Sequence, residues 1–213
     1  MRKSIIFGAL VAASLVSASA QADTLFSTAD LNDFSSSYEP GAYIIDASNF
    51  IGASFHLNSA ADISAIGGYF TQYSADNIFA AIVAAGTSWS NLASAALTEV
   101  TFSGSGADQT VALNSNVHLA AGDYQVVFGS GLFGANGSSG LVNSQYTNGN
   151  PVINQSFDAG QTISTLATPD VRVTIAGTLA PVPEADSLAM LLAGLGALTL
   201  VARRRKGPGA ASI

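Results

Sequence analysis

The sequence predicts an all-β fold, a single β-sandwich or jelly-roll-like domain over residues 23–180. Short apolar or alternating runs recur along this stretch, and most contain β-branched or aromatic residues. Gly, Asn, Asp and Ser separate the runs, as expected for turns between strands. No stretch shows the 3.6-residue apolar periodicity of a long amphipathic helix.

Eight segments are expected to form strands. Residues 98–102 and 171–175 alternate between apolar and polar, as half-buried strands do. Gly67-Gly68, inside the longest run, predicts a bulge or a bend. Residues 89–96 are expected to form one or two helical turns. In chain order the expected strands are Ala42–Ile45, 54–57, 63–73, Ile78–Ala84, 97–102, 117–119, 124–128 and 171–175.

A stretch of this length can bury a hydrophobic core without disulfides. The chain has no cysteine, which excludes a disulfide scaffold, a Cys-based zinc site and a thiol nucleophile. The aromatic residues expected in the core are Phe55, Phe70, Phe79, Phe102, Tyr124 and Phe128.

Charge is distributed unevenly along the chain. Arg172 is the only basic residue between positions 23 and 182, where twelve Asp and Glu residues give a net charge of −11. Binding to a nucleic-acid backbone needs several Lys or Arg residues on one face, so the body is not expected to bind nucleic acid. Binding of the body to anionic lipid is excluded for the same reason.

The N-terminus has the organisation of a secretory signal peptide over residues 1–22. Two basic residues open the chain, and the apolar run 5–16 is too short to span a bilayer about 30 Å thick. Ala20 and Ala22 then form an A-x-A cleavage site. The alternatives are a retained anchor or a buried helix. We expect export through the Sec machinery and a mature chain that begins at Asp23.

The C-terminus has the organisation of a membrane anchor. Residues 187–202 carry no charge and would form a helix about 24 Å long, slightly shorter than a full span. Four adjacent cations follow this run, and they would stop transfer and remain cytoplasmic. An ordinary buried helix would instead show a polar stripe. The stop-transfer residues are Arg203, Arg204, Arg205 and Lys206.

A Pro-Glu motif, an uncharged apolar run and a basic tail follow one another at the C-terminus. Together, these three features resemble the PEP-CTERM sorting signal of Gram-negative bacteria. Val182-Pro183-Glu184 stands before the apolar run, and the basic tail follows it, so the resemblance covers residues 181–206 of the sorting segment 181–213. It departs from the family pattern at Ala185, which replaces the second Pro. The resemblance implies processing by exosortase, a membrane protease. An intermediate anchored in the inner membrane would precede release to the cell surface or the medium.

No catalytic motif occurs in this sequence together with the neighbouring residues and elements that its chemistry requires. His56 and His118, the only histidines, each lie between two apolar residues of an expected strand, so their side chains should point to the opposite face. Neither has the spacing of a metal ligand, and no G-x-S-x-G elbow occurs. The G-x-G-x-x-G at residues 129–134 lacks the helix and the acidic residue of a dinucleotide site. We therefore expect a protein without catalytic residues.

Calcium is the one cofactor with some support, although no cofactor is required. Asp30, Asn32 and Asp33 cluster in the sequence, as do Asp76 and Asn77, and Ca²⁺ takes such loop oxygens. No EF-hand loop is present, and turn formation by these side chains accounts for the same residues.

Trp89 and Tyr146 are the candidate ligand-binding residues, because both lie in polar, loop-like segments. Trp89 is either a buried plug under a loop or an exposed surface on which a sugar stacks. Export and composition together favour a non-enzymatic matrix or biofilm component that binds or organises extracellular polysaccharide. The alternatives are a secreted hydrolase of surface glycans and a coat protein without a specific ligand.

Overall fold

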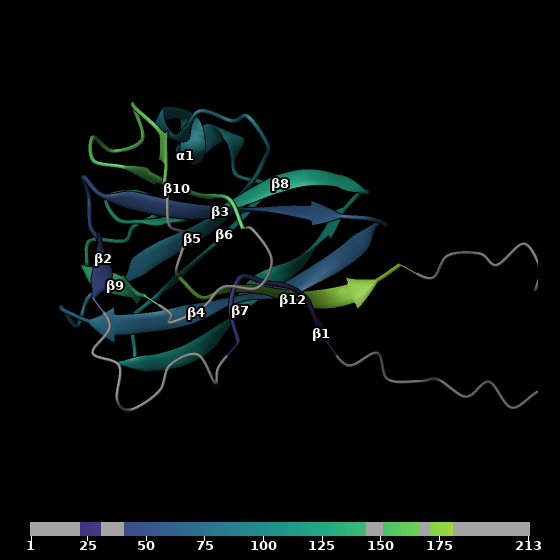
Figure 1. Ribbon diagram of the computed structural model, residues 1–213, viewed down its shortest axis with the longest axis horizontal. Helices are drawn as coiled ribbons and strands as arrows, with labels where there is room; N and C mark the ends of the chain where they lie inside the picture. The colour runs from purple at the N-terminus through teal and green to yellow at the C-terminus, as the bar shows by residue number, and fades with distance from the viewer. Residues whose placement is uncertain (1–21, 31–40, 144–150, 167–170, 181–213) are drawn as a thin grey trace, which may run out of the picture.

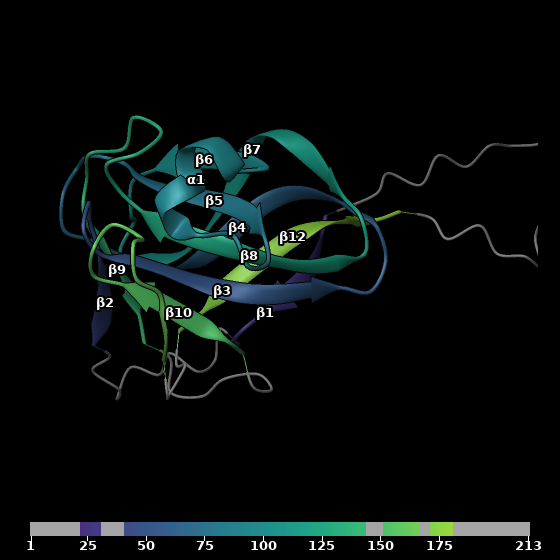
Figure 2. The ribbon, with the colours of Figure 1, turned by 90° about the horizontal axis from the view of Figure 1, so that it is seen from above.

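A computed structural model describes residues 22–30, 41–143, 151–166 and 171–180, which form two antiparallel β-sheets packed face to face (Figures 1 and 2). The all-β prediction is confirmed. Within the described ranges, no helix is long and apolar enough to cross a membrane. The expected membrane helix at 187–202 lies outside these residues, as does the expected signal peptide up to residue 21.

The first sheet is organised around β4. Its residue Phe70 pairs with Ala107 of β7 and with Leu141 of β9, so these two strands flank β4 on opposite edges. β12 also pairs with β4, and β1 pairs with β12. The six strands are β1 (Asp23–Ser27), β2 (Ala42–Ile45), β4 (Ala61–Gln72), β7 (Ala107–Leu119), β9 (Ser139–Val142) and β12 (Val173–Leu179).

The second sheet has the strand order β11-β10-β3-β8-β5-β6. A 3₁₀ turn (Trp89–Asn91) and the short helix α1 (Leu92–Ala95) lie over its outer face (Figure 1). The helical turns expected at residues 89–96 are therefore confirmed. The strands are β3 (Phe50–Leu57), β5 (Ile78–Ala84), β6 (Thr98–Phe102), β8 (Gly122–Gly129), β10 (Ile153–Ser156) and β11 (Ser164–Thr165).

The main core lies between the two sheets. Phe70 of the first sheet packs edge-to-face on Phe128 of the second, with ring centroids 5.2 Å apart, and on Phe102 at 5.1 Å. Phe55 is buried in the same core, while Tyr124 is partly buried beside it. The five expected phenylalanines are thus confirmed as core residues, with Phe79 in a second core, whereas Tyr124 is only partly buried.

The second core lies on the outer face of β5. Ile78 and Ile82 point into the main core, whereas Phe79 and Val83 point outward and pack with Trp89. Both faces of β5 are therefore covered, which explains why this strand reads as an unbroken apolar run.

Of the two alternatives expected at Gly67-Gly68, a bulge or a bend, the bulge is wrong. The pairing register of β4 with β7 shifts between Ile63 and Ala65, several residues earlier. Gly67 serves a different purpose, because a Cβ at this position would lie 2.4 Å from Oγ1 of Thr174 and 2.8 Å from the carbonyl oxygen of Gln109. Glycine is required here so that the strands on both sides can approach β4 closely.

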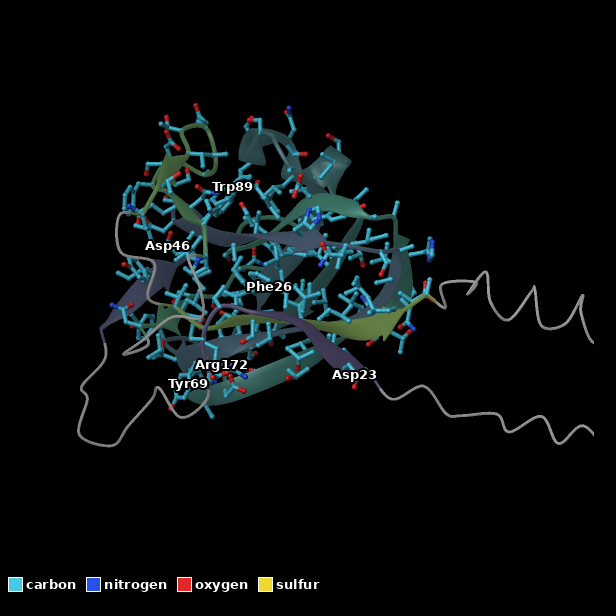
Figure 3. The ribbon with its side chains drawn as sticks, turned by 45° about the vertical axis from the view of Figure 1, so that its right-hand side comes forward. Asp23, Phe26, Asp46, Tyr69, Trp89 and Arg172 are labelled. Carbon is cyan, nitrogen blue, oxygen red and sulfur yellow. The ribbon has the colours of Figure 1, made fainter. Side chains whose placement is uncertain are left out.

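Arg172, the only basic residue of the body, joins three strands of the first sheet (Figure 3). Its Nε donates to Oδ1 of Asp108 at 2.7 Å. Its Nη1 donates to Oγ of Ser27 at 3.1 Å and to the carbonyl oxygen of Ala29. The arginine side chain is only 12% exposed, so this ion pair is largely withdrawn from water.

We expect Arg172→Met to lower the free energy of unfolding by about 2–4 kcal/mol, because it leaves a half-buried carboxylate without its partner. The measurement is urea denaturation of the mature protein. Removing both charges in Arg172→Met/Asp108→Leu should restore part of the loss, since no uncompensated charge then remains. A single variant within about 0.5 kcal/mol of the parent would contradict this role.

Candidate functional site

One end of the sandwich, which we call the base, carries both ends of the described body. It is formed by Asp23, by Leu179 and by the links at residues 58–60 and 120–121. Asp23 pairs with Gly177, and Leu179 pairs with Ala61 at the start of β4. The first and last strands therefore begin and end side by side at the base (Figure 1).

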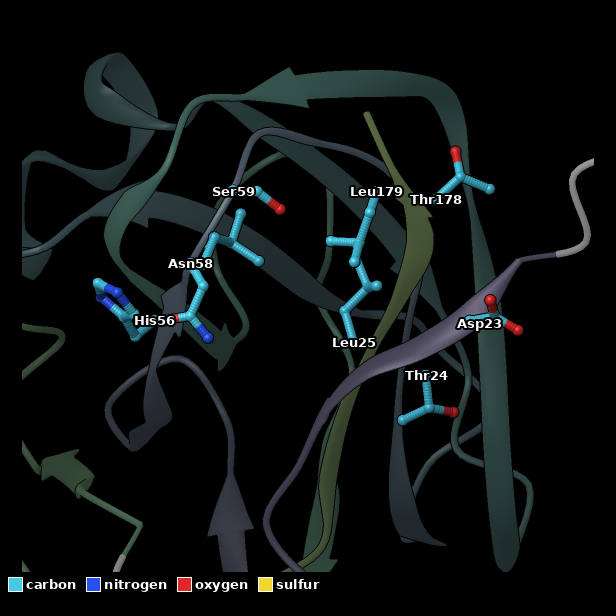
Figure 4. A pocket seen from close by; sticks show the side chains of 9 residues that line it. Asp23, Thr24, Leu25, His56, Asn58, Ser59, Thr178 and Leu179 are labelled. Carbon is cyan, nitrogen blue, oxygen red and sulfur yellow. The ribbon is translucent and has the colours of Figure 1, made fainter. Parts of the chain in front are cut away.

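A hollow of about 570 Å³ opens at the base between β1, the end of β3 and the end of β12 (Figure 4). Its apolar lining includes Leu179, which is 57% exposed. The carboxylate of Asp23 and the amide of Asn58 supply polar groups. The full lining is Asp23, Thr24, Leu25, His56, Leu57, Asn58, Ser59, Thr178 and Leu179.

A second hollow of about 390 Å³ adjoins the first, and the two share His56. Three aromatic rings form a ladder along it, with Phe26 and Tyr124 each 5.7 Å from the ring centroid of Phe55. We call the two hollows together the groove. The second hollow is lined by Phe26, Ser54, Phe55, His56, Ala85, Asp123, Tyr124, Pro151 and Val152.

A His–Asp pair stands at the junction of the two hollows. His56 and Asp123 are direct cross-strand partners on β3 and β8, and Nδ1 lies 2.7 Å from Oδ1 of Asp123. The two side chains are 56% and 71% exposed. As expected, the ring of His56 faces away from its buried neighbours Phe55 and Leu57. Its Nε2 is therefore available to hydrogen-bond a ligand.

The first sheet carries a matching pair outside the groove. His118 and Asp62 are also direct cross-strand partners, on β7 and β4, with Nδ1 2.8 Å from Oδ1. Neither residue lines either hollow. The two pairs have the same local geometry, so His118 provides an internal control for any role assigned to His56.

Trp89 does not provide a stacking surface, so that expectation is wrong and the buried plug is correct. Its side chain is fully buried, and its Nε1 donates to Oε1 of Gln125 at 3.1 Å. Gly160 covers it so closely that a Cβ there would lie 2.6 Å from Cβ of Trp89. Tyr146 lies outside the described residues.

The described residues give little evidence for a metal site or a nucleotide site. Within them, no three His, Cys, Asp or Glu side chains come together in a way that could hold a metal ion. Asn32 and Asp33 lie outside these residues, and Oδ1 of Asn77 accepts a hydrogen bond from Ser103. No helix follows the Gly-rich segment 129–134 up to residue 143, and Phe133 packs on Phe79 instead.

Asp158 organises the loop that covers Trp89. Its Oδ1 accepts hydrogen bonds from the backbone N–H of Thr162 at 2.8 Å and from Oγ of Ser156 at 2.7 Å. These bonds, with the one from Thr162 contributing most, lower the pKa of Asp158 from 3.8 to about 2. The nearby backbone of Gly160 donates to the same serine oxygen at 2.9 Å.

A family model described as the PEP-CTERM protein-sorting motif matches residues 181–206. The chain carries a PEP-CTERM sorting motif. The motif implies export, membrane-associated sorting to the cell surface and processing by an exosortase-type enzyme. The match includes Val182, Pro183 and Glu184 and the basic residues 203–206, all outside the described structure. No curated protein matches the chain significantly.

The PEP-CTERM motif begins directly after the folded body. The backbone N–H of Ala180 donates to the carbonyl oxygen of Ala60 at 2.8 Å, so strand-like pairing extends beyond Leu179. The match starts at the next residue, 181. The base, with its groove, is therefore the part of the fold nearest to the sorting motif.

We expect Trp89→Ala to lower the free energy of unfolding by about 3–5 kcal/mol, because it leaves a cavity in the second core. Trp89→Phe, which keeps an aromatic ring, should cost less. Chemical denaturation of the three proteins measures the difference. An alanine variant that keeps its stability but loses a ligand would contradict the burial of this side chain.

We expect Asp158→Asn to destabilise the protein at pH 7 but not near pH 2. The pKa of Asp158 is lower in the folded protein than its ordinary 3.8, so the carboxylate stabilises the fold above about pH 4 and loses this effect as the pH falls toward 2. Melting temperatures from pH 2 to pH 7 measure the convergence. Asp76→Asn, which also removes one exposed loop carboxylate, is the control for the loss of a negative charge.

Proposed function

We propose that this exported PEP-CTERM protein binds extracellular polysaccharide through the groove at its base, without turning it over. The observation that carries the proposal is the second hollow, which is lined both by the partly exposed rings of Phe26 and Tyr124 and by the exposed His56–Asp123 pair. Phe55 is buried and supports the two rings from the core side. The role would be that of a matrix or biofilm component at the cell surface.

The groove offers the two kinds of contact that a sugar ring needs. The apolar face of a sugar packs on aromatic and aliphatic side chains, and its hydroxyls exchange hydrogen bonds with a few fixed polar groups. Asp123 can accept from a hydroxyl, while Nε2 of His56 and the amide of Asn58 can donate or accept. An open groove also lets a long polymer pass through, because its ends need not be enclosed.

The negative charge of the groove favours neutral polysaccharides over anionic ones. Arg172 is the only cation of the described body, and it is already paired with Asp108. Asp23 and Asp123 line the groove, and nearby negative charges repel an anionic polymer. We therefore propose a neutral polysaccharide as the ligand, rather than one rich in uronic acid or sulfate.

A binding role without catalysis is favoured by the surroundings of the two histidines. In the described part of the chain, no serine or threonine hydroxyl hydrogen-bonds to either ring, so neither His–Asp pair is extended to a nucleophile. Release of reducing sugars from a polymer by the purified protein would favour the alternative, a hydrolase of surface glycans.

The proposed route to the surface has two membrane steps. Residues 1–22 direct export through the Sec machinery and are removed, so that β1 begins the mature chain. Residues 187–202 then hold the body at the inner membrane of a Gram-negative cell, with residues 203–206 in the cytoplasm. Processing near Val182-Pro183-Glu184 releases the body.

The test compares His56→Ala with His118→Ala in co-sedimentation with neutral exopolysaccharide from the host. His56→Ala should weaken binding about five- to tenfold, the equivalent of one lost hydrogen bond, whereas His118→Ala should bind like the parent. Equal losses in both variants would contradict the groove. No saturable binding by the parent would favour a coat protein without a specific ligand. Repeating the assay with Ca²⁺ and then with EDTA tests for a calcium requirement.

A further inference from the structure

The distance between the fold and the sorting motif is very short. Paired structure reaches Ala180, and the motif residue Pro183 follows three positions later. Four residues beyond Leu179 reach at most about 14 Å even when fully extended, and eight residues, up to position 187, reach at most about 28 Å. A body of this length is about 40 Å across, so it is wider than its own tether is long.

The base is therefore confined next to whatever engages the motif. The end of β12 is held by strands on both sides, since Gly177 pairs with Ile63 of β4 and with Asp23 of β1. The pairing continues through Thr178 and Leu179 on the β4 side. A protease that binds Pro183 must therefore meet the base, because the tether is too short for the folded body to turn away.

The chemistry of the base indicates which partner it meets. Three carboxylates lie there, on Asp23, Asp62 and Asp123, and no Lys or Arg does within the described residues. Two of the carboxylates also contact a histidine ring, Asp62 that of His118 and Asp123 that of His56. Anionic lipids attract basic segments and repel acidic ones, so the base is poorly suited to rest on the bilayer. Leu179 is 57% exposed at the mouth of a hollow with a mixed polar and apolar lining, and a surface of this mixed kind suits contact with another protein better than contact with lipid.

We propose that the base packs against the extracytoplasmic face of the exosortase-type enzyme while that enzyme engages the motif. The folded body thereby takes part in substrate recognition together with the tail. The complementary face of the enzyme is neutral or basic, since the base is acidic. This inference rests on the proposed export and on the processing that the PEP-CTERM motif implies.

The test follows the conversion of the full-length precursor in its host by pulse-chase. Asn58→Lys/Ser59→Lys places two cations on the base, at positions whose side chains form no hydrogen bond within the described residues. We expect it to slow processing about three- to tenfold, because like charges then face each other across the contact. Asn58→Asp/Ser59→Asp, which keeps the base acidic, should be processed at least as fast as the parent.

A matched control adds the same charge at the opposite end. Ala75 and Ser105 are exposed and lie in the β4–β5 and β6–β7 links, away from the base. Ala75→Lys/Ser105→Lys should be processed at the parental rate. A six-residue Gly-Ser insertion between Ala180 and Pro181 should make processing insensitive to the lysines at 58 and 59, because the base is then free to move away. Resistance of the accumulated precursors to added protease checks that each variant is folded.

The outcomes separate this inference from the proposed function. Equal processing rates for the parent and for Asn58→Lys/Ser59→Lys would overturn the contact, as would a persistent effect of the lysines after the insertion. An unprocessed parent would overturn the sorting route itself and the contact with it. Polysaccharide binding is measured separately on the released protein, so its failure leaves the processing result standing.

Discussion

The insertion of β12 between β4 and β1 is the constraint on which the rest of the structure depends. β12 contributes Val173 and Ile175 to the main core, and within the described residues it is the only strand that pairs with β1. The first and last strands are thus joined across about the whole body, a long-range contact whose formation costs loop-closure entropy. Arg172, at the start of β12, holds this arrangement from the end opposite the base.

Hydrogen bonds between uncharged groups satisfy buried polar side chains of the described body. Oγ1 of Thr28 is fully buried, donates to the carbonyl of Val171 and accepts from the N–H of Val173, which ties the end of β1 to the start of β12. Thr165 similarly donates to the buried amide of Asn154 at 2.9 Å. Such pairing removes the cost of burying polar groups in a chain with only 10% charged residues.

The sequence predicts elements well where burial follows apolar periodicity. β2 and β5 are confirmed to the residue, whereas β1, β9, β10, β11 and residues 107–116 of β7 are missed. Ser139 and Asn154 are buried polar residues satisfied across strands, which hydropathy cannot reveal, and much of β7 is polar because it is exposed. Trp89 has polar neighbours in sequence, but its cover comes from Gly160, far along the chain. The groove depends on the register of β3 with β8, which pairs His56 with Asp123 and which no local pattern specifies.

The groove and the sorting motif share the base because the same strands build both. β1 and β12 bring the two ends of the body together, and the links that follow β3 and β7 close the sandwich beside them. In the proposed contact, a tether shorter than the body is wide would keep the groove next to the membrane enzyme for as long as the tail is attached. If both proposals hold, one molecule cannot offer its groove to a polymer and its motif to the enzyme at the same time. Release from the membrane would therefore also free the groove for its ligand, so that binding begins where the protein is needed, outside the cell.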